Sequence, residues 1–106
     1  MLKLREKHNN ENTLWYDFSD GEIKLGQAQI KLVTYDGNNI FYEVLEQYRG
    51  KGWGEKLLIE VLAECKRLGF RQLTLLCEKD NLASKVILDK HCGKGIELVR
   101  YIYEII

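Results

Sequence analysis

The fold is decided by the stretch Arg49-Gly50-Lys51-Gly52-Trp53-Gly54, which separates two segments with different hydrophobic periods. The apolar run Ile40 to Leu45 before it has the composition of a buried strand. Glu55 to Leu68 after it places its apolar residues on one helical face. A glycine-rich turn that leads directly into a helix presents free backbone N–H groups and the positive end of the helix dipole. We therefore expect a phosphorylated ligand to bind at this turn.

The next segments predict a β-α-β unit. The helix should stop at Gly69, a C-cap residue that follows a basic last turn. Its inward residues are expected to be Leu57, Leu58, Val61, Leu62, Cys65 and Leu68. Arg71 to Cys77 has the pattern of a buried central strand. Because a helix connects this strand to Ile40–Leu45, the two strands should run parallel, joined by a right-handed crossover.

A second helix and a last strand complete the predicted chain. The helix begins at an N-cap, Asp80 or Asn81, and continues to about Lys90. Its inward residues are expected to be Leu82, Val86 and Ile87. Ile96 to Ile106 alternates as a strand does and is rich in isoleucine and tyrosine. Such a strand, if exposed at a sheet edge, predicts a possible homodimer.

The first half of the chain reads as strands joined by turns. The expected strands are Leu2 to Lys7, Thr13 to Phe18, Glu22 to Val33 and Asn39 to Leu45. Asp20-Gly21 between two of them is a strong hairpin signal, so an antiparallel meander is expected. The predicted fold class is therefore α+β: a mixed, mostly antiparallel sheet with two main helices.

Composition predicts one domain, residues 1–106, because no linker-like segment interrupts the chain. Lys plus Arg number 16 and Asp plus Glu number 16, so the basic excess typical of nucleic-acid binders is absent. No apolar run is long enough to span a membrane, and the charged start does not resemble a signal peptide, which favours a cytoplasmic protein. Cys65, Cys77 and Cys92 lack metal-ligand or disulfide spacing, so no metal is expected.

Other phosphate motifs do not fit the glycine turn. No G-x-x-x-x-G-K sequence followed by Ser or Thr occurs, which disfavours nucleotide hydrolysis. A dinucleotide fingerprint that starts at Gly50 would need its third glycine at Glu55. The remaining alternative is structural: the glycines could serve only to make a tight turn with positive φ angles.

Two motifs in order resemble one family. Arg49-x-x-Gly52-x-Gly54, after a strand and before a long helix, resembles the acetyl-CoA motif Q/R-x-x-G-x-G/A of the GNAT superfamily of N-acetyltransferases. Asp80 to Lys90 resembles the family's second signature, in which an Asn and a small residue start a helix that ends near E-K-x-G. The resemblance covers about Ile40 to Gly93, roughly half of the chain.

The resemblance implies acetyl-CoA as the acetyl donor, with its pyrophosphate at the glycine turn. The residues expected to contact it there are Arg49, Gly50, Lys51, Gly52, Trp53, Gly54 and Glu55. In the family, a bulge separates the preceding strand from its neighbour, and the pantetheine arm pairs with the exposed backbone, here of Tyr42, Glu43 and Val44. Asn81 matches an Asn that binds this arm, although a bare N-cap explains it almost as well. Ser84 is a weaker candidate on the same helix.

Some of these side chains have a structural alternative. Trp53 is expected to pack into the fold rather than against the edge of the coenzyme. Arg49 and Lys51 could attract phosphates, but exposed basic residues beside a turn are more often solvated surface.

The catalytic groups are less clear. Many relatives place a Tyr general acid two residues before the Lys of E-K-x-G, and that position here is Leu88. Glu43 is the candidate base because it lies beside the expected thioester, while the alternative is an outward-facing charge on a strand. Cys77 as a nucleophile and Tyr42 as a proton donor are weaker than packing roles for the same side chains. We expect direct transfer through a water-mediated base.

The short, polar segment Lys7 to Thr13 stands where larger relatives insert one or two helices that wall the acceptor site. An open site suits either a small-molecule amine or a peptide or protein amine. Three functions remain in competition: an acetyl-CoA-dependent N-acetyltransferase, a weak or inactive coenzyme-binding module, and an interaction domain without coenzyme.

Overall fold

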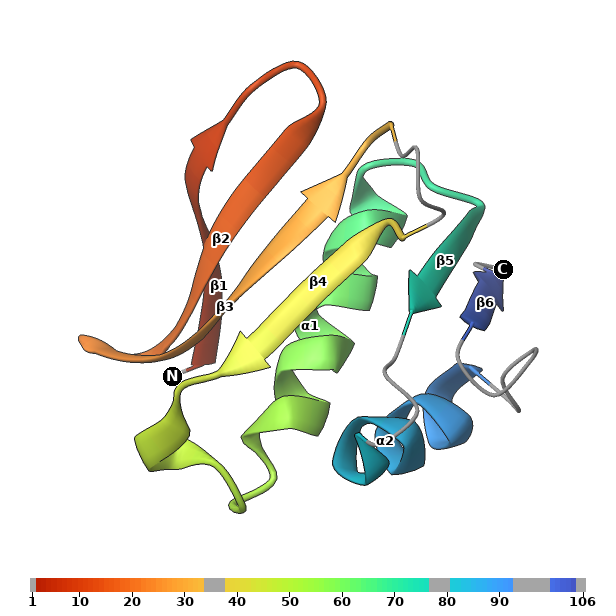
Figure 1. Ribbon diagram of the computed structural model, residues 1–106. Helices are drawn as coiled ribbons and strands as arrows, with labels where there is room; N and C mark the ends of the chain where they lie inside the picture. The colour runs from red at the N-terminus through yellow and green to blue at the C-terminus, as the bar shows by residue number, and fades with distance from the viewer. Residues whose placement is uncertain (1, 34–37, 77–80, 93–99, 105–106) are drawn as a thin grey trace.

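The computed structural model describes residues 2–33, 38–76, 81–92 and 100–104 (Figure 1). The elements in chain order are β1 (Leu2–Asn9), β2 (Thr13–Asp20), β3 (Ile23–Lys31), β4 (Ile40–Val44), the 3-10 turn η1 (Glu46–Tyr48), α1 (Trp53–Arg67), β5 (Gln72–Leu76), α2 (Leu82–Cys92) and β6 (Arg100–Glu104). The predicted order of strands and helices is confirmed. Only their ends differ by a few residues.

The first four strands form the predicted antiparallel meander in the order β1-β2-β3-β4. The turn between β1 and β2 is held by Asn10, whose Oδ1 accepts the N–H groups of Asn12 and Thr13 at 2.8 and 2.9 Å. Gly21 makes the β2–β3 turn with a φ of 61°. The Asp20-Gly21 signal therefore marked a real hairpin, because glycine adopts this backbone conformation without strain.

The sheet is not continuous after β4. β5 pairs antiparallel with β6 in a second, two-stranded sheet, and no ladder joins β5 to β4 among the described residues. Figure 1 shows β4 and β5 running in the same general direction, as a β-α-β unit requires. The predicted parallel direction is therefore confirmed, although β4 and β5 share no ladder in the described part of the chain.

Asn39 joins the two sheets at one end. Its N–H donates to the Thr74 carbonyl at 2.8 Å, and its Oδ1 accepts the Thr74 N–H at 3.0 Å. Its Nδ2 also donates to the Lys31 carbonyl at 3.1 Å. One backbone bond and one side-chain bond of Asn39 therefore join β5 to the start of β4 without forming a ladder.

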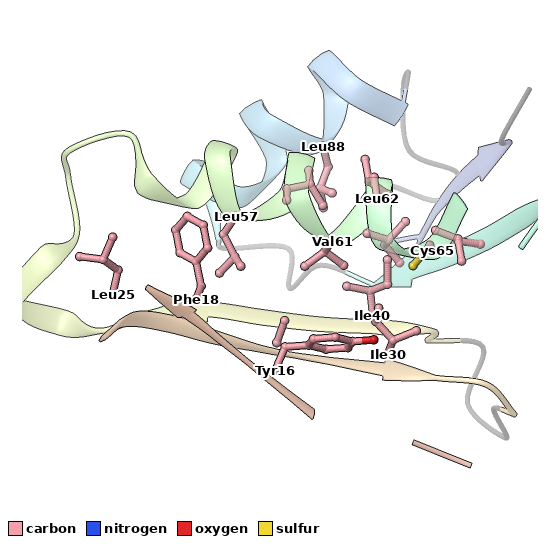
Figure 2. Close-up of a cluster of buried hydrophobic side chains, with 14 residues drawn as sticks. Tyr16, Phe18, Leu25, Ile30, Ile40, Leu57, Val61, Leu62, Cys65 and Leu88 are labelled. Carbon is pink, nitrogen blue, oxygen red and sulfur yellow. The ribbon is translucent and has the colours of Figure 1, made fainter. Parts of the chain in front are cut away.

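The core lies between the four-stranded sheet and α1 (Figure 2). Five of the six inward residues predicted on this helix are buried: Leu57, Leu58, Val61, Leu62 and Cys65. Leu68, the sixth, is partly buried at the edge of the core. The helix is followed by Gly69, whose φ of 93° lies in the left-handed region, and the Phe70 N–H donates to the Cys65 carbonyl at 3.1 Å. The predicted glycine stop is therefore confirmed.

The predicted inward face of α2 is partly wrong. Val86 is 68% exposed, whereas Leu88 is only 1% exposed and belongs to the core. Ile87 packs against the core as expected. The apolar residues of this short helix are spread around its circumference, so their period alone does not select a face. The burial of the Leu82 side chain lies outside the described residues.

Candidate coenzyme site

The glycine turn is a tight and open loop. The Tyr48 N–H donates to the Leu45 carbonyl at 2.9 Å, and the Arg49 N–H donates to the Glu46 carbonyl at 3.2 Å. Gly50 and Gly52 follow with φ angles of 80° and 84°. A Cβ at either position would meet nothing within 4 Å. The turn therefore requires glycine for its backbone conformation, and it also leaves its surface open to a ligand.

The start of α1 carries no side-chain cap. Gly52 occupies the N-cap position, and none of the described side chains bonds to it as a cap. The N–H groups of the first turn, from Trp53 onward, have no earlier helical carbonyl to bond. These groups and the helix dipole favour an anion at this end of α1.

Gly54 differs from the other two glycines of the turn. A Cβ on Gly54 would lie 3.4 Å from Ile87 Cδ1 and 3.9 Å from Val44 Cγ2. The position is therefore enclosed by protein atoms rather than open to a ligand, which corrects the expectation of open backbone there. The missing side chain lets the start of α1 lie close to both α2 and β4.

The outer edge of β4 faces the gap before β5. The backbone N–H of Lys31 donates to the Asn39 carbonyl at 2.7 Å, and the backbone N–H of Leu45 donates to the Leu25 carbonyl at 2.8 Å. The odd-numbered residues from 39 to 45 therefore direct their backbone groups toward β3. Strand alternation then directs the backbone groups of Tyr42 and Val44 away from β3. The resemblance assigns this edge to the pantetheine arm. It also names Glu43 and a bulge, and both are wrong here, because the Glu43 backbone faces β3 and the β3–β4 register is unbroken.

Arg49 folds back onto this edge. Its Nε donates to the Val44 carbonyl at 2.9 Å, although the side chain remains exposed. The guanidinium therefore links the loop to the end of β4. Lys51 is exposed on the same loop.

Trp53 packs into the fold, as predicted. Its ring meets Phe18 edge-on at a centroid distance of 6.5 Å, and Lys56 Nζ lies 4.8 Å from the centre of the Trp53 ring. The indole therefore anchors the first turn of α1 on the four-stranded sheet.

Asn81 is the N-cap of α2. Its Oδ1 accepts the Ser84 N–H at 3.2 Å, and its carbonyl accepts the Lys85 N–H at 3.0 Å. The capping role considered from the sequence is thus observed, and Ser84 is half-buried on the same turn. Figure 1 shows α2 at the end of the molecule where the glycine loop also lies.

Glu55 has a side-chain role that the sequence did not indicate. Its Oε2 lies 2.9 Å from Lys90 Nζ and 2.7 Å from His91 Nε2. These two hydrogen bonds hold the pKa of the Glu55 carboxyl below its usual range. The contact ties the start of α1 to the end of α2, and no sequence pattern pairs residues so far apart.

Glu43 lies on the opposite face of the sheet from α1. Tyr42 and Val44 pack against the core, so alternation turns Glu43 to the other face. There its Oε1 accepts a hydrogen bond from Gln27 Nε2. Gln27 was not singled out in the sequence, because the contact depends on the register of β3 and β4.

The comparisons with known proteins bear on this geometry. Residues 2–93 match the model of the acetyltransferase (GNAT) family. The chain belongs to the GNAT family. A comparison with curated proteins gives no match.

Solved structures share the GNAT fold of this chain. They include RimL, a ribosomal L7/L12 alpha-N-protein acetyltransferase in complex with coenzyme A (TM-score 0.68, 16% identity, 89% of this chain and 63% of that one). A cAMP-binding acyltransferase mutant from Mycobacterium smegmatis gives a TM-score of 0.70 at 16% identity over 90% of this chain and 31% of that one. The microcin C7 self-immunity acetyltransferase MccE, in complex with acetyl-CoA and AMP, gives 0.63 at 18% identity over 92% and 62%. The chain thus spans less than two thirds of each of these proteins.

Two features distinguish this GNAT chain from the family pattern used above. Leu88, at the position where many relatives carry a Tyr acid, is buried in the core. A short turn joins β1 to β2 directly, but it is shorter than the predicted segment Lys7 to Thr13, because β1 extends to Asn9 and β2 begins at Thr13. Cys77 lies outside the described residues.

Two further observations concern ions and membranes. Within the described ranges, no group of three or more His, Cys, Asp or Glu side chains could hold a metal ion. None of the helices described is long and apolar enough to cross a membrane.

Proposed function

We propose that the chain is an acetyl-CoA-dependent N-acetyltransferase that moves an acetyl group directly to a primary amine. One observation carries the proposal. Gly50 and Gly52 have positive φ angles, and they lead into the start of α1, which has no side-chain cap and follows the outer edge of β4. Membership of the GNAT family supports it. RimL with coenzyme A and MccE with acetyl-CoA, which share the fold, support the choice of donor.

Different residues of the chain would bind different parts of acetyl-CoA. The N–H groups of the first turn of α1 would hold the pyrophosphate, with Arg49 and Lys51 adding positive charge. The outward backbone groups of Tyr42 and Val44 would align the pantetheine arm. Asn81 would contact the same arm from the start of α2, in addition to its capping role.

The transfer itself needs a neutral amine, a polarised carbonyl and a stabilised thiolate. When bound, acetyl-CoA supplies the activated acetyl group as a thioester. Glu43 would accept the proton of the amine through a water molecule. With Leu88 in place of a tyrosine, water would also protonate the thiolate.

The buried Leu88 also favours a second candidate, a coenzyme-binding module with little or no turnover. Calorimetry with coenzyme A, followed by thiol release from acetyl-CoA across a panel of amines, separates the two. The transferase predicts both binding and turnover. Binding without turnover on any amine would favour the module, and no binding would contradict both.

Glu43→Gln tests the proposed base in the same assays. We expect kcat to fall by about 100-fold, at the low end for general base catalysis, while the affinity for coenzyme A is unchanged. Glu22→Gln, an exposed glutamate in the β2–β3 turn, is the control. An unchanged kcat in Glu43→Gln would remove Glu43 from the mechanism.

A further inference from the structure

The four-stranded sheet carries a pocket of about 310 Å³. Its lining includes Lys7, His8, Trp15, Asp17, Gln27, Gln29 and Phe41. On β2 and β3 these residues alternate with Tyr16, Phe18, Ala28 and Ile30, which are buried in the core. The pocket therefore opens on the face of the sheet turned away from α1, the same face as Glu43. Figure 2 shows the labelled core side chains, including Tyr16 and Ile30, on the α1 side.

Strand register arranges the lining in two rows. Trp15 pairs with Gln29, and Gln29 pairs with Phe41, so this row has an aromatic ring at each side of an amide. His8 extends the row, with its ring 5.0 Å from the Trp15 ring. The second row consists of Asp17 and Gln27, and Glu43, which pairs with Gln27, lies beside this row but outside the lining.

The two carboxylates differ in their partners. Asp17 Oδ1 lies 3.0 Å from Lys24 Nζ and 4.0 Å from Lys7 Nζ, so its charge is already balanced. Glu43 bonds to the neutral amide of Gln27, and no Lys or Arg of the described residues forms an ion pair with it. Lys24 Nζ also bonds to Gln27 Oε1 at 3.1 Å, which turns the amide N–H groups of Gln27 toward Glu43. The negative charge of Glu43 thus lies next to the pocket, beside its lining residue Gln27.

We propose that this pocket binds the acetyl acceptor, and that the acceptor is a small primary amine with an aromatic body. This inference rests on the proposed function. The rings of Trp15 and Phe41 would hold the body of the acceptor, and the ammonium group would point to Glu43. The volume is at the small end of ligand pockets, which suits one small molecule better than a peptide.

The position of β4 connects the pocket to the donor. Phe41 and Glu43 face the pocket side of the sheet, while the backbone of Tyr42 and Val44 faces the edge proposed for the pantetheine arm. β4 would therefore contact the acceptor with its side chains and the donor with its backbone groups.

The transfer step balances with these groups. The ammonium gives one proton to Glu43 through water, and its nitrogen forms a C–N bond to the acetyl carbonyl carbon. The C–S bond breaks, and the sulfur leaves as a thiolate. The second nitrogen proton passes through water to the thiolate, which gives the amide and coenzyme A, and Glu43 returns its proton to solvent.

Direct binding tests the pocket without any turnover. The chain has two tryptophans, Trp15 in the pocket and Trp53 at the start of α1, so the second is an internal reference. In NMR spectra of the labelled protein, 2-phenylethylamine should shift the indole N–H signal of Trp15 and leave that of Trp53 in place. No shift of Trp15, or a shift that follows protein concentration alone and so indicates a second copy on this face, would overturn the proposal.

Kinetics with matched variants tests the role of the pocket in transfer. Phe41 and Ile59 are 42% and 46% exposed, and Ile59 lies on α1. Phe41→Ser should raise the KM for 2-phenylethylamine by about tenfold or more, because the aromatic contact is lost, while the KM for acetyl-CoA is unchanged. Ile59→Ser should change neither KM. Equal KM values for the amine in Phe41→Ser and the wild type would overturn the proposal.

The results distinguish this inference from the proposed function. Turnover of amines without any response at Trp15 or Phe41 would overturn the pocket and leave the transferase in place. A shift of Trp15 by the amine, in a protein that does not bind coenzyme A, would support the pocket and its ligand class and contradict the transferase.

Discussion

Gly52 and Gly69 lie at opposite ends of α1 and share two properties. Their φ angles are 84° and 93°, and a Cβ at either position would meet nothing within 4 Å. An alanine at each site therefore meets the same kind of backbone strain without a steric clash inside the protein. The two glycines differ in their relation to the helix dipole, because only Gly52 precedes the positive end.

This pair makes a matched test of the coenzyme site. Gly52→Ala and Gly69→Ala should each lower the free energy of unfolding by about 1 kcal/mol, measured by urea denaturation. Calorimetry should show about tenfold weaker binding of coenzyme A to Gly52→Ala only, because its Cβ would occupy the ligand side of the turn. Equal affinities in the two variants would contradict the placement of the pyrophosphate.

Cys65 shows how burial decides the chemistry of a residue. Its side chain is in the core, and desolvation raises the pKa of the Cys65 thiol to about 12. The thiol therefore stays protonated at neutral pH and contributes packing rather than nucleophilic reactivity.

At the scale of elements, Glu55 connects the two helices that border the proposed coenzyme site. Lys90 and His91, in the last turn of α2, both reach its carboxylate in the first turn of α1. An acidic residue at a helix start and basic residues at a helix end each also suit the local dipole. The contact thus holds α2 beside the glycine loop.

The lowered pKa of Glu55 predicts a pH-dependent contribution to stability. Its folded pKa lies below the ordinary value of 4.5, so the carboxylate stabilises the fold above about pH 4.5, and the effect is lost as the pH falls through the folded pKa. Relative to Glu55→Gln, the wild type should be more stable at neutral pH, and the difference should disappear in acid. Denaturation at several pH values measures it.

The exposed Glu22 provides the control for this prediction. Glu22→Gln should follow the wild type at every pH, because Lys90 and His91 bond to Glu55 and not to Glu22. A difference between the wild type and Glu55→Gln that persists at the lowest pH would contradict the role of the Glu55 carboxylate.

At the scale of the whole molecule, Asn39 holds the two sheets together. Its side chain and backbone bond to Thr74 and to Lys31, so it joins β3, the start of β4 and β5. The strands diverge from this point because they share no ladder. The proposed coenzyme edge of β4 depends on that divergence.

Asn39→Ala should therefore affect both stability and binding. Leaving the Thr74 N–H and the Lys31 carbonyl without these partners should lower the free energy of unfolding by about 1 to 3 kcal/mol, and coenzyme A should bind more weakly. Denaturation and calorimetry measure the two effects. Asn12→Ala, at an exposed turn position, should change neither, and equal results for the two variants would refute the role of Asn39.

The sequence by itself determined the order of the elements and several of their ends. The Asp20-Gly21 hairpin, the inward face of α1 and the stop at Gly69 were all predicted correctly, because each depends on residues close together in the chain. The glycine turn and Asn81 also identified the family, since their spacing is a local property.

Only the tertiary structure decided the relations between distant segments. The separation of β4 from β5, the burial of Leu88 and the contact of Glu55 with α2 were not predictable from hydrophobic period. The enclosure of Gly54 and the bond between Gln27 and Glu43 likewise depend on how the elements pack and on strand register. The physical reason is the same throughout: local propensity determines what a segment forms, while packing and hydrogen bonding between segments determine what each side chain meets.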